Sequence, residues 1–401
     1  MIELAEAVAA VVREAARIGC EEVGLEQAAG RVLSAPIVAA LDAPPFDATA
    51  MDGWAIRVPG SEPFPTRHAV LGVLPAGRVW QDEVGPGEAL KVMTGAPIPA
   101  GADAVVPVEE ADEGPEGVDL REVPKRGAHV RRRGEVFASG RTLVEPPARL
   151  TPALVALAAS AGLRTVVVSR RPVAGLLVTG EEVVSSGPVG PGQIPNSNGP
   201  LLRAALERAG AGVIDLGVVQ DDEGTLERRI TEGVSRHLDL LVTTGGVSAG
   251  DYDLVQAVLV RLGAKVVFHK VAIRPAKPVL FARLGPLLVF GLPGNPVSAA
   301  VAFDLFVRPA LRAMEGLVPT VAPVRAELTA PVRNGGERLA FLPGRLRPRF
   351  PTWTVEPIPT KGSHDLLAQA LADAYIVVPP RTKLAAGEAV DVYPGGDDST
   401  I

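Results

Sequence analysis

The fold of this chain is decided by the stretch Leu238-Asp-Leu-Leu-Val-Thr-Thr-Gly-Gly-Val-Ser-Ala-Gly-Asp-Tyr-Asp253. It begins with a short, mostly apolar run, Leu238 to Val242, whose length is that of a buried parallel strand. The run breaks at Gly245-Gly246, where a backbone without side chains turns tightly and approaches a ligand closely. A helix is predicted to follow from Tyr252 to Leu262. Strand, glycine turn and helix start would direct unpaired N–H groups at one point, which suits an anion such as phosphate.

The sequence around this stretch alternates between predicted strands and predicted helices from residue 172 to residue 316. The predicted strands are Val173–Thr179, Gly212–Val219, Leu240–Thr244, Lys265–Val271, Val279–Arg283 and Leu287–Gly291, and the other predicted helices are Pro200–Ala209, Glu223–Arg236 and Pro296–Met314. Such alternation predicts βαβ units and a mostly parallel sheet. Ligands of such sheets bind beyond the carboxyl ends of the strands.

The rest of the chain is predicted to be mainly β. The predicted fold class is therefore α/β plus β, in several domains. The expected division is a helical connecting domain (1–45 and 140–171, with helices at 1–20 and Thr151–Ala161), a small β domain inserted near the N-terminus (46–139), the α/β domain (172–316) and a C-terminal β barrel or sandwich (317–401). Strands expected in the last part are Val324–Leu328, Trp353–Pro357, Tyr375–Pro379 and Ala389–Tyr393.

Composition excludes several classes of function. The net charge of −6 over 401 residues gives no indication of binding to nucleic acid or to an acidic membrane. A single cysteine, Cys20, excludes an internal disulfide framework and a cysteine-rich zinc site. The N-terminus is acidic and amphipathic, unlike a signal peptide, and no run approaches the ~20 apolar residues that span a bilayer. We therefore expect a cytoplasmic protein.

Charged side chains cluster in the loops that follow the predicted strands. The acids are Glu181, Glu182, Asp221, Asp222, Asp251 and Asp253, and the bases are Lys270, Arg274 and Lys277. Two unit charges ~5 Å apart repel by roughly 3 kcal/mol at an effective dielectric constant of ~20. Several acids beside a phosphate therefore require a hard divalent cation, and Mg²⁺ is expected. In the alternative interpretation, the acids cap helices or are solvated in loops.

Three polar loops allow both a structural and a functional interpretation. Asn196-Ser-Asn198 either caps the helix that begins near Pro200 or contacts a ligand. Pro293 and Pro296 flank Gly294-Asn295, and because proline donates no hydrogen bond they are expected to shape a pocket. Asp52 lies in an irregular loop that is either an apolar plug with solvated acids or a functional segment.

Five motifs carry a resemblance to a known family. They are Pro45-Phe-Asp-Ala-Thr-Ala-Met-Asp-Gly-Trp-Ala55, Met93-Thr-Gly-Ala-Pro97, Thr179-Gly-Glu-Glu182, Gly245-Gly-Val-Ser248 and Gly291-Leu-Pro-Gly-Asn-Pro-Val-Ser298. Together, and in this order over nearly the whole chain, they resemble the MoeA family of molybdopterin molybdenumtransferases, which is related to the gephyrin E domain.

The resemblance implies an activity and an assembly. The enzyme would insert molybdenum from molybdate into adenylylated molybdopterin and release AMP with the help of Mg²⁺. It would form an elongated homodimer whose active site lies between the α/β domain of one subunit and the small β domain of the other. Its partners would be a pterin nucleotide and a molybdopterin adenylyltransferase, but neither nucleic acid nor a membrane.

The resemblance also assigns roles to single residues. It implies catalytic roles for Asp52, Thr94, Glu182, Asp221, Asp253, Arg274 and Lys277, of which Glu182, Asp221 and Asp253 would hold the metal. It implies substrate binding by Gly245, Gly246, Ser248, Lys270, Pro293, Asn295 and Pro296. Two departures from the family pattern stand out. Arg274-Pro-Ala-Lys-Pro278 replaces Lys-Pro-Gly-Lys-Pro, and Val136 stands where the family has an acid, for which the neighbouring Glu135 is the candidate replacement.

Two other functions share these sequence features. A molybdopterin adenylyltransferase has a related α/β domain and glycine turn, although the Asp52 and Thr94 segment argues against it. A gephyrin-like scaffold is the second alternative, but this chain lacks a long linker to an appended domain.

Overall fold

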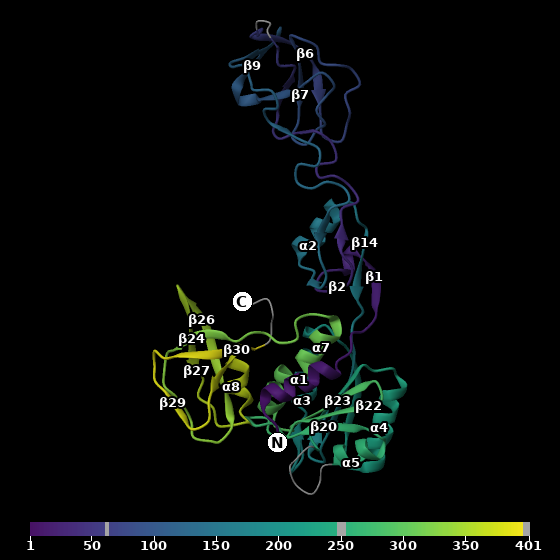
Figure 1. Cartoon of the computed structure of the whole chain (residues 1–401), viewed down its shortest axis with the longest axis vertical. Helices are drawn as coiled ribbons and strands as arrows, with labels where there is room; N and C mark the ends of the chain where they lie inside the picture. The colour runs from purple at the N-terminus through teal and green to yellow at the C-terminus, as the bar shows by residue number, and fades with distance from the viewer. Residues whose placement is uncertain (61–63, 247–253, 396–401) are drawn as a thin grey trace. The chain divides into compact units, whose positions relative to one another are not determined.

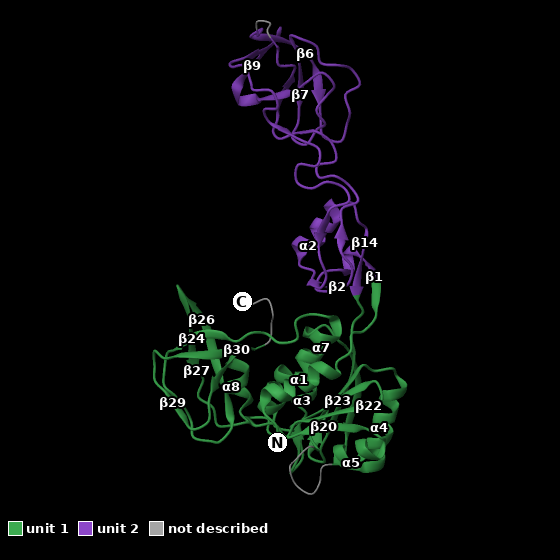
Figure 2. Ribbon diagram, in the orientation of Figure 1, with its two compact units in different colours: residues 1–21, 169–401 green, residues 22–168 purple. Residues whose placement is uncertain are grey.

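A computed structural model describes residues 1–60, 64–246 and 254–395 of the chain (Figure 1). It divides into two compact units, one made of residues 1–21 and 169–401 and the other of residues 22–168 (Figure 2). Within the described residues, no helix is both long enough and apolar enough to cross a bilayer. The division into four domains with the boundaries given above remains a prediction.

The first unit is built on a six-stranded sheet in the order β18-β15-β19-β23-β22-β20. The bounds are β15 Val173–Thr179, β18 Gly212–Val219, β19 Leu240–Thr244, β20 Lys265–His269, β22 Leu280–Leu284 and β23 Leu287–Leu292. Strands β18, β15, β19 and β23 are parallel, and β22 is antiparallel to both of its neighbours. Strand β20 therefore runs in the same direction as the parallel four. The mostly parallel sheet is confirmed, and five of its strands end at one edge.

Helices cover both faces of this sheet. They are α1 Leu4–Glu14, α3 Asn198–Arg208, α4 Glu223–Ser235, α5 Leu254–Arg261, α6 Pro296–Ala302, the π-helical segment η3 Phe303–Val307, and α7 Arg308–Glu315. One core unites α1, α3 and the α6–η3–α7 run with the sheet, and a second core unites α4 and α5 with the opposite face. Successive residues of each strand supply the two cores in turn, as Leu240 and Leu241 do.

Two helix predictions need correction. The helix expected over residues 1–20 ends at Glu14, because Ala15 is extended and the chain then follows tertiary contacts: the Ile18 N–H donates to the Met314 carbonyl at 3.0 Å. The helix expected from Pro296 to Met314 is interrupted by η3. The residues expected to begin the helix at Tyr252 lie outside the described part of the chain.

The C-terminal part of the first unit is a closed five-stranded barrel. Its strands are β24 Val324–Leu328, β26 Leu339–Arg349, β27 Thr352–Pro357, β28 Ala374–Val378 and β30 Ala389–Pro394, and β26 also pairs with β28 to close the ring. Strand β26 was not predicted, because Pro343, Gly344 and Pro348 interrupt its pattern. A short strand β21, Ile273–Arg274, leaves the α/β part and pairs with the edge of β26. The short elements β25 Val332–Asn334, α8 Leu366–Leu371 and β29 Thr382–Leu384 complete this region.

The second unit contains a sheet in the order β8-β5-β7-β6-β10-β9 and a smaller one in the order β1-β14-β2-β13. The bounds are β1 Cys20–Gly24, β2 Val32–Leu33, β5 Gly53–Ile56, β6 Arg67–Leu74, β7 Glu88–Val92, β8 Ala104–Pro107, β9 Ala111–Gly114, β10 Gly117–Leu120, β13 Ala148–Arg149 and β14 Thr165–Ser169. Helix α2, Pro152–Ser160, begins as predicted, because the Thr151 side chain accepts the Leu154 N–H at 3.3 Å.

The aromatic centre of the α/β core offers a test of this packing. Phe290 is fully buried, and its ring lies 4.9 Å from that of Phe281. We expect Phe290→Ala to lower the free energy of unfolding by about 3–5 kcal/mol, because it leaves a cavity that the sheet cannot close. The control Val260→Ala, at a position that is 53% exposed, should change it by less than about 0.5 kcal/mol. Scanning calorimetry measures both, and equal losses would contradict the assignment of Phe290 to the core.

Candidate functional site

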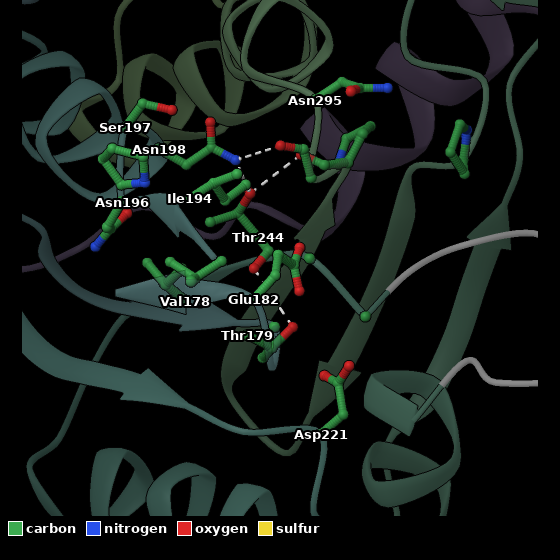
Figure 3. Close-up of a pocket in the computed structure, with 18 residues that line it drawn as sticks. Val178, Thr179, Glu182, Ile194, Asn196, Ser197, Asn198, Asp221, Thr244 and Asn295 are labelled. Carbon is green, nitrogen blue, oxygen red and sulfur yellow. Dashed lines mark hydrogen bonds between the residues drawn. The ribbon is translucent and has the colours of Figure 1, made fainter. Parts of the chain in front are cut away.

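A cavity of about 390 Å³ opens at the edge of the sheet where the parallel strands end (Figure 3). We call it the acidic cavity. It is lined by Val178–Gly180, Glu182, Val183, Ile194–Asn198, Asp221, Thr244–Gly246, Pro278 and Pro293–Asn295. The structure thus brings together Glu182, Asp221, Gly245, Gly246, Pro293 and Asn295, which are six of the predicted site residues.

The glycine turn after β19 has no room for side chains. Gly245 has a φ of +90°, and a Cβ there would lie 2.2 Å from the Thr179 carbonyl oxygen. Gly246 has a φ of +63°, and its Cβ would lie 2.9 Å from Thr179 Oγ1. The N–H of Gly245 donates to the Leu292 carbonyl at 3.2 Å. The prediction of a free anion-binding N–H is therefore wrong for Gly245, whose amide joins the strand ends.

The two carboxylates in the cavity oppose each other electrostatically. Glu182 and Asp221 both line the cavity, and both side chains are labelled in Figure 3. Partial burial, followed by the negative charges of Glu182 and Glu181, raises the pKa of Asp221 above its usual range. The neighbouring Asp222 behaves differently, because its Oδ2 accepts the Thr225 N–H at 2.7 Å and caps α4. Among the acids of these loops that the structure describes, the interpretation as a helix cap is therefore correct for Asp222, and Asp221 is left beside like charge.

Asn198 ties two walls of the cavity together. Its Nδ2 donates to Thr244 Oγ1 at 2.8 Å and to the Gly294 carbonyl at 2.7 Å, and Thr244 Oγ1 donates to the Pro293 carbonyl at 3.1 Å (Figure 3). The capping role belongs instead to Asn196, whose Oδ1 accepts the Gly199 N–H at 2.8 Å. Sequence reasoning left Asn198 undecided and gave Thr244 no role, because their partners lie about 50 to 100 residues away in the chain.

A second cavity of about 580 Å³ adjoins the first. We call it the basic cavity. Arg274 and Lys277 line it from the α/β part, and Arg338, Lys361 and His364 line it from the barrel region. None of the described residues that line it is acidic. The two cavities share Pro278, Pro293 and Asn295 as lining residues, so these three form a common wall.

The three basic residues from the barrel region escaped sequence reasoning. They lie more than 60 residues after Lys277, in a region expected to be a separate β domain. The pairing of β21 with β26 brings them beside Arg274, and Arg338 Nη1 donates to the Ile273 carbonyl at 2.8 Å. The polar turn Lys361-Gly-Ser-His364 between predicted strands was the available signal.

Two predicted substrate-binding residues, Lys270 and Pro296, do not line either cavity. Neither Lys270 nor Pro296 is among the described residues that line the two cavities. Lys270 has a φ of +98°, and its N–H donates to the Val279 carbonyl at 3.1 Å. Pro296 is the first residue of α6, a position where proline suits the helix start. Contacts of these two residues with a bound substrate remain a prediction.

Asp52 and Thr94 form a pair in the second unit. Asp52 Oδ1 accepts the Thr94 N–H at 2.6 Å and the Thr94 hydroxyl at 2.7 Å. These bonds, led by that of the Thr94 side chain, lower the pKa of Asp52, so its carboxylate stays charged. In the same unit, Glu135 Oε2 accepts the Arg132 N–H at 2.8 Å, and Val136 is 64% exposed. The predicted site residues Ser248 and Asp253 lie outside the described residues.

Metal ligands can be assessed for the described residues alone. Among residues 1–60, 64–246 and 254–395, no three His, Cys, Asp or Glu side chains gather as a metal-binding group. The acidic cavity supplies two carboxylates, those of Glu182 and Asp221. Mg²⁺ is commonly held by one or two carboxylates together with substrate phosphates, so this pair fits that ion.

Comparisons with known proteins cover almost the whole chain. Residues 2–162 match the MoeA N-terminal region (domain I and II), residues 175–313 match a probable molybdopterin binding domain, and residues 325–394 match the MoeA C-terminal region (domain IV). The chain is also similar to two crystal structures of the molybdopterin biosynthesis MoeA protein from Pyrococcus horikoshii. Their TM-scores are 0.83 and 0.81 at 32% and 28% identity, over 98% of this chain and 99% and 100% of theirs.

Relatives with assigned names agree with these matches. Molybdopterin molybdenumtransferase 2 of Mycobacterium tuberculosis is 37% identical over 387 residues, which is 92% of this chain and 94% of that protein. Molybdopterin molybdenumtransferase of Bacillus subtilis is 34% identical over 373 residues, or 90% and 86% of the two chains. The chain therefore belongs to the MoeA family.

Proposed function

We propose that this chain is a molybdopterin molybdenumtransferase that inserts molybdenum from molybdate into adenylylated molybdopterin and releases AMP. The observation that carries the proposal is the pair of adjoining cavities with opposite charge. The acidic cavity suits a cation with its phosphates, and the basic cavity suits an oxyanion. A single wall of Pro278, Pro293 and Asn295 lies between the two.

The acidic cavity would hold Mg²⁺ and the phosphates of the pterin nucleotide. Glu182 and Asp221 supply hard oxygen ligands, and Asp253 is proposed as a third ligand from outside the described residues. Desolvation, followed by the charges of Glu182 and Glu181, raises the pKa of Asp221, and a bound cation would offset both effects. When bound, Mg²⁺ would neutralise phosphate charge and polarise the phosphate oxygens.

The basic cavity would bind molybdate. Arg274 offers a planar guanidinium fork and Lys277 a compact ammonium group, and both side chains are exposed to the cavity's solvent. At ~4 Å and an effective dielectric constant of ~20, each cation attracts a unit negative charge by about 4 kcal/mol. These side chains would concentrate the oxyanion beside the pterin and offset charge that develops during transfer, so they would act electrostatically and not covalently.

The remaining parts of the proposal concern assembly and location. We infer that Asp52 and Thr94 reach the site from the second subunit of a cytoplasmic homodimer. The fixed, charged carboxylate of Asp52 would suit contact with a ligand or a cation there. A molybdopterin adenylyltransferase is the class of enzyme that would supply the adenylylated substrate.

The two alternative functions are not favoured. Whole-length relatives carry the name molybdopterin molybdenumtransferase, and the N-terminal and C-terminal regions match along with the central domain. ATP-dependent adenylylation of molybdopterin without molybdate would support the adenylyltransferase instead. Stable filament or receptor partners in a pull-down would support the scaffold.

The direct test is molybdate-dependent AMP release by the purified protein. We expect Glu182→Gln to lower kcat/KM by about 10²-fold, because it removes charge that would bind the cation on the phosphates. Lys277→Met should instead raise the half-saturating molybdate concentration. Retention of the parental rate by Glu182→Gln would remove Glu182 from the metal site, and AMP release without molybdate would contradict the proposed reaction.

A second test examines the acidic cavity without catalysis. Because the folded-state pKa of Asp221 is raised, the metal-free protein loses stability as pH rises through that pKa. Asp221→Asn should therefore raise the melting temperature at neutral pH by about 1–2 °C without Mg²⁺, and by less near pH 4. Adding Mg²⁺ should stabilise the parent, by about 2.7 kcal/mol at a hundred times its dissociation constant, and the variant much less.

The matched control for this test is Asp222→Asn. It removes the same charge from the next residue but keeps a capping side chain on α4. We expect its response to Mg²⁺ to equal that of the parent. Equal loss of the response in both variants would show a general effect of surface charge and not a site at Asp221.

A further inference from the structure

The basic cavity is assembled from two parts of the first unit. Arg274 and Lys277 belong to the α/β part, whereas Lys361 and His364 belong to the loop that precedes helix α8 in the barrel region. An oxyanion can contact both parts at once only if they keep a fixed separation. The contacts that hold the α8 loop in place therefore influence binding in this cavity.

The first such contact begins in the π-helical segment η3. Asp304 lies in this segment with its side chain only 14% exposed, and it forms an ion pair with Arg308, whose side chain is 10% exposed. A buried carboxylate is costly unless it is paired and hydrogen-bonded. Burial accordingly raises the pKa of Asp304, and Arg308 and Tyr375 act against that rise.

The second contact crosses from η3 to the barrel. The hydroxyl of Tyr375, on β28, accepts Gln369 Nε2 at 2.9 Å, and Asp304 of η3 lines the same cavity as Tyr375. Tyr375 is 2% exposed and packs in one core with Phe303 and Phe306 of η3. Gln369 lies in α8, so Tyr375 links that helix to the core that η3 shares. We call Asp304, Tyr375 and Gln369 the latch.

The loop before α8 is fixed to the same helical run at another point. The Val297 N–H in α6 donates to the Ser363 carbonyl at 3.2 Å. Asp365 caps α8, since its Oδ1 accepts the Ala368 N–H at 3.2 Å, and its Oδ2 accepts the Lys361 N–H at 2.9 Å. The loop with Lys361 and His364 is thus fixed to two helices. One is α6, which also borders the cavity, and the other is α8, which the latch holds.

The π-helical segment η3 accounts for the position of the latch. A π-helical turn adds a residue to the helix and shifts the direction of the side chains around it, and such turns are often found at functional sites. Here the turn lies between α6 and α7, and its acid Asp304 lines a cavity together with Tyr375 of the barrel strand β28. Pro343 pairs with Tyr375 across the strands and lines the basic cavity.

We propose that Tyr375, acting through Gln369, is a positioning residue that sets the geometry of the basic cavity and thereby the affinity for the tetrahedral oxyanion. It does not touch the oxyanion. The inference rests on the proposed function only in naming molybdate as that oxyanion. It concerns the affinity for the oxyanion and leaves binding of the pterin nucleotide in the acidic cavity unchanged.

The experiment compares Tyr375→Phe with the parent protein. Phenylalanine keeps the ring in the core and removes the hydroxyl that accepts Gln369 Nε2. We expect the half-saturating molybdate concentration to rise about five- to tenfold. The half-saturating concentration of the pterin nucleotide and kcat at saturating molybdate should stay within about twofold, which general damage to the fold would not permit.

A second variant and a matched control keep the test decisive. Gln369→Met removes the Gln369 donor with a side chain of similar length, and it should reproduce the molybdate effect even if Tyr375→Phe folds poorly. Tyr393→Phe makes the same chemical change at another tyrosine of the barrel, whose hydroxyl has no hydrogen bond among the described residues, and it should behave like the parent. Parental molybdate saturation in Tyr375→Phe or Gln369→Met, or equal shifts for molybdate and pterin, would overturn the proposal.

Direct binding of molybdate, measured by equilibrium dialysis, separates this inference from the proposed function. If the parent protein binds molybdate but releases no AMP, the proposed reaction fails, and the ratio of dissociation constants still tests the latch. If the parent protein binds no molybdate, the inference fails too.

Discussion

The burial of the central sheet on both faces is the constraint on which the rest of this protein depends. Strands such as β15, β19 and β23 are buried almost throughout, so their charged neighbours in sequence can reach water only at the strand ends. Because five of the six strands end at one edge, Glu182, Asp221 and the Gly245-Gly246 turn gather there without any direct bond between the two acids. The chemistry of the site begins as a consequence of how the core is packed.

The reversed strand β22 and the short strand β21 extend this arrangement. The chain leaves β20 at the same edge, pairs briefly with the barrel through β21, and returns along β22. The segment that connects β20 to β22 therefore carries Arg274 and Lys277 out of the sheet, where they line one cavity with Arg338 and Lys361. Through this segment of about ten residues, the α/β part and the barrel region become the two sides of the basic cavity. The same segment contains two of the non-glycine residues with positive φ, Lys270 and Ala276, whose backbone conformations local preference alone would not choose.

Much of the α/β part could be predicted from the sequence, because long buried strands and amphipathic helices have strong periodic signals. Three strands, β15, β18 and β19, have the predicted bounds, and the predicted acids and glycines at their ends do share a cavity. Features set by tertiary contacts could not be predicted. The π-helical turn in the run from Pro296 has no periodic signal, and strand β26 contains two prolines and a glycine. Arg338 and Lys361 join the site through a strand pair formed across more than 60 residues, and the amide of Gly245 is used by a strand neighbour that no local pattern reveals.

The wall between the cavities has a consequence for how this protein stores charge. Two of its three members are prolines, which are stiff and have no N–H to offer either side. Glu182 lines the acidic cavity and Lys277 lines the basic cavity. The two side chains form no ion pair with each other among the described residues. The wall thus separates the carboxylates of one cavity from the cations of the other, so these opposite charges do not neutralise each other within the protein. Each cavity therefore keeps its own charge before any ligand binds: negative in the acidic cavity and positive in the basic cavity.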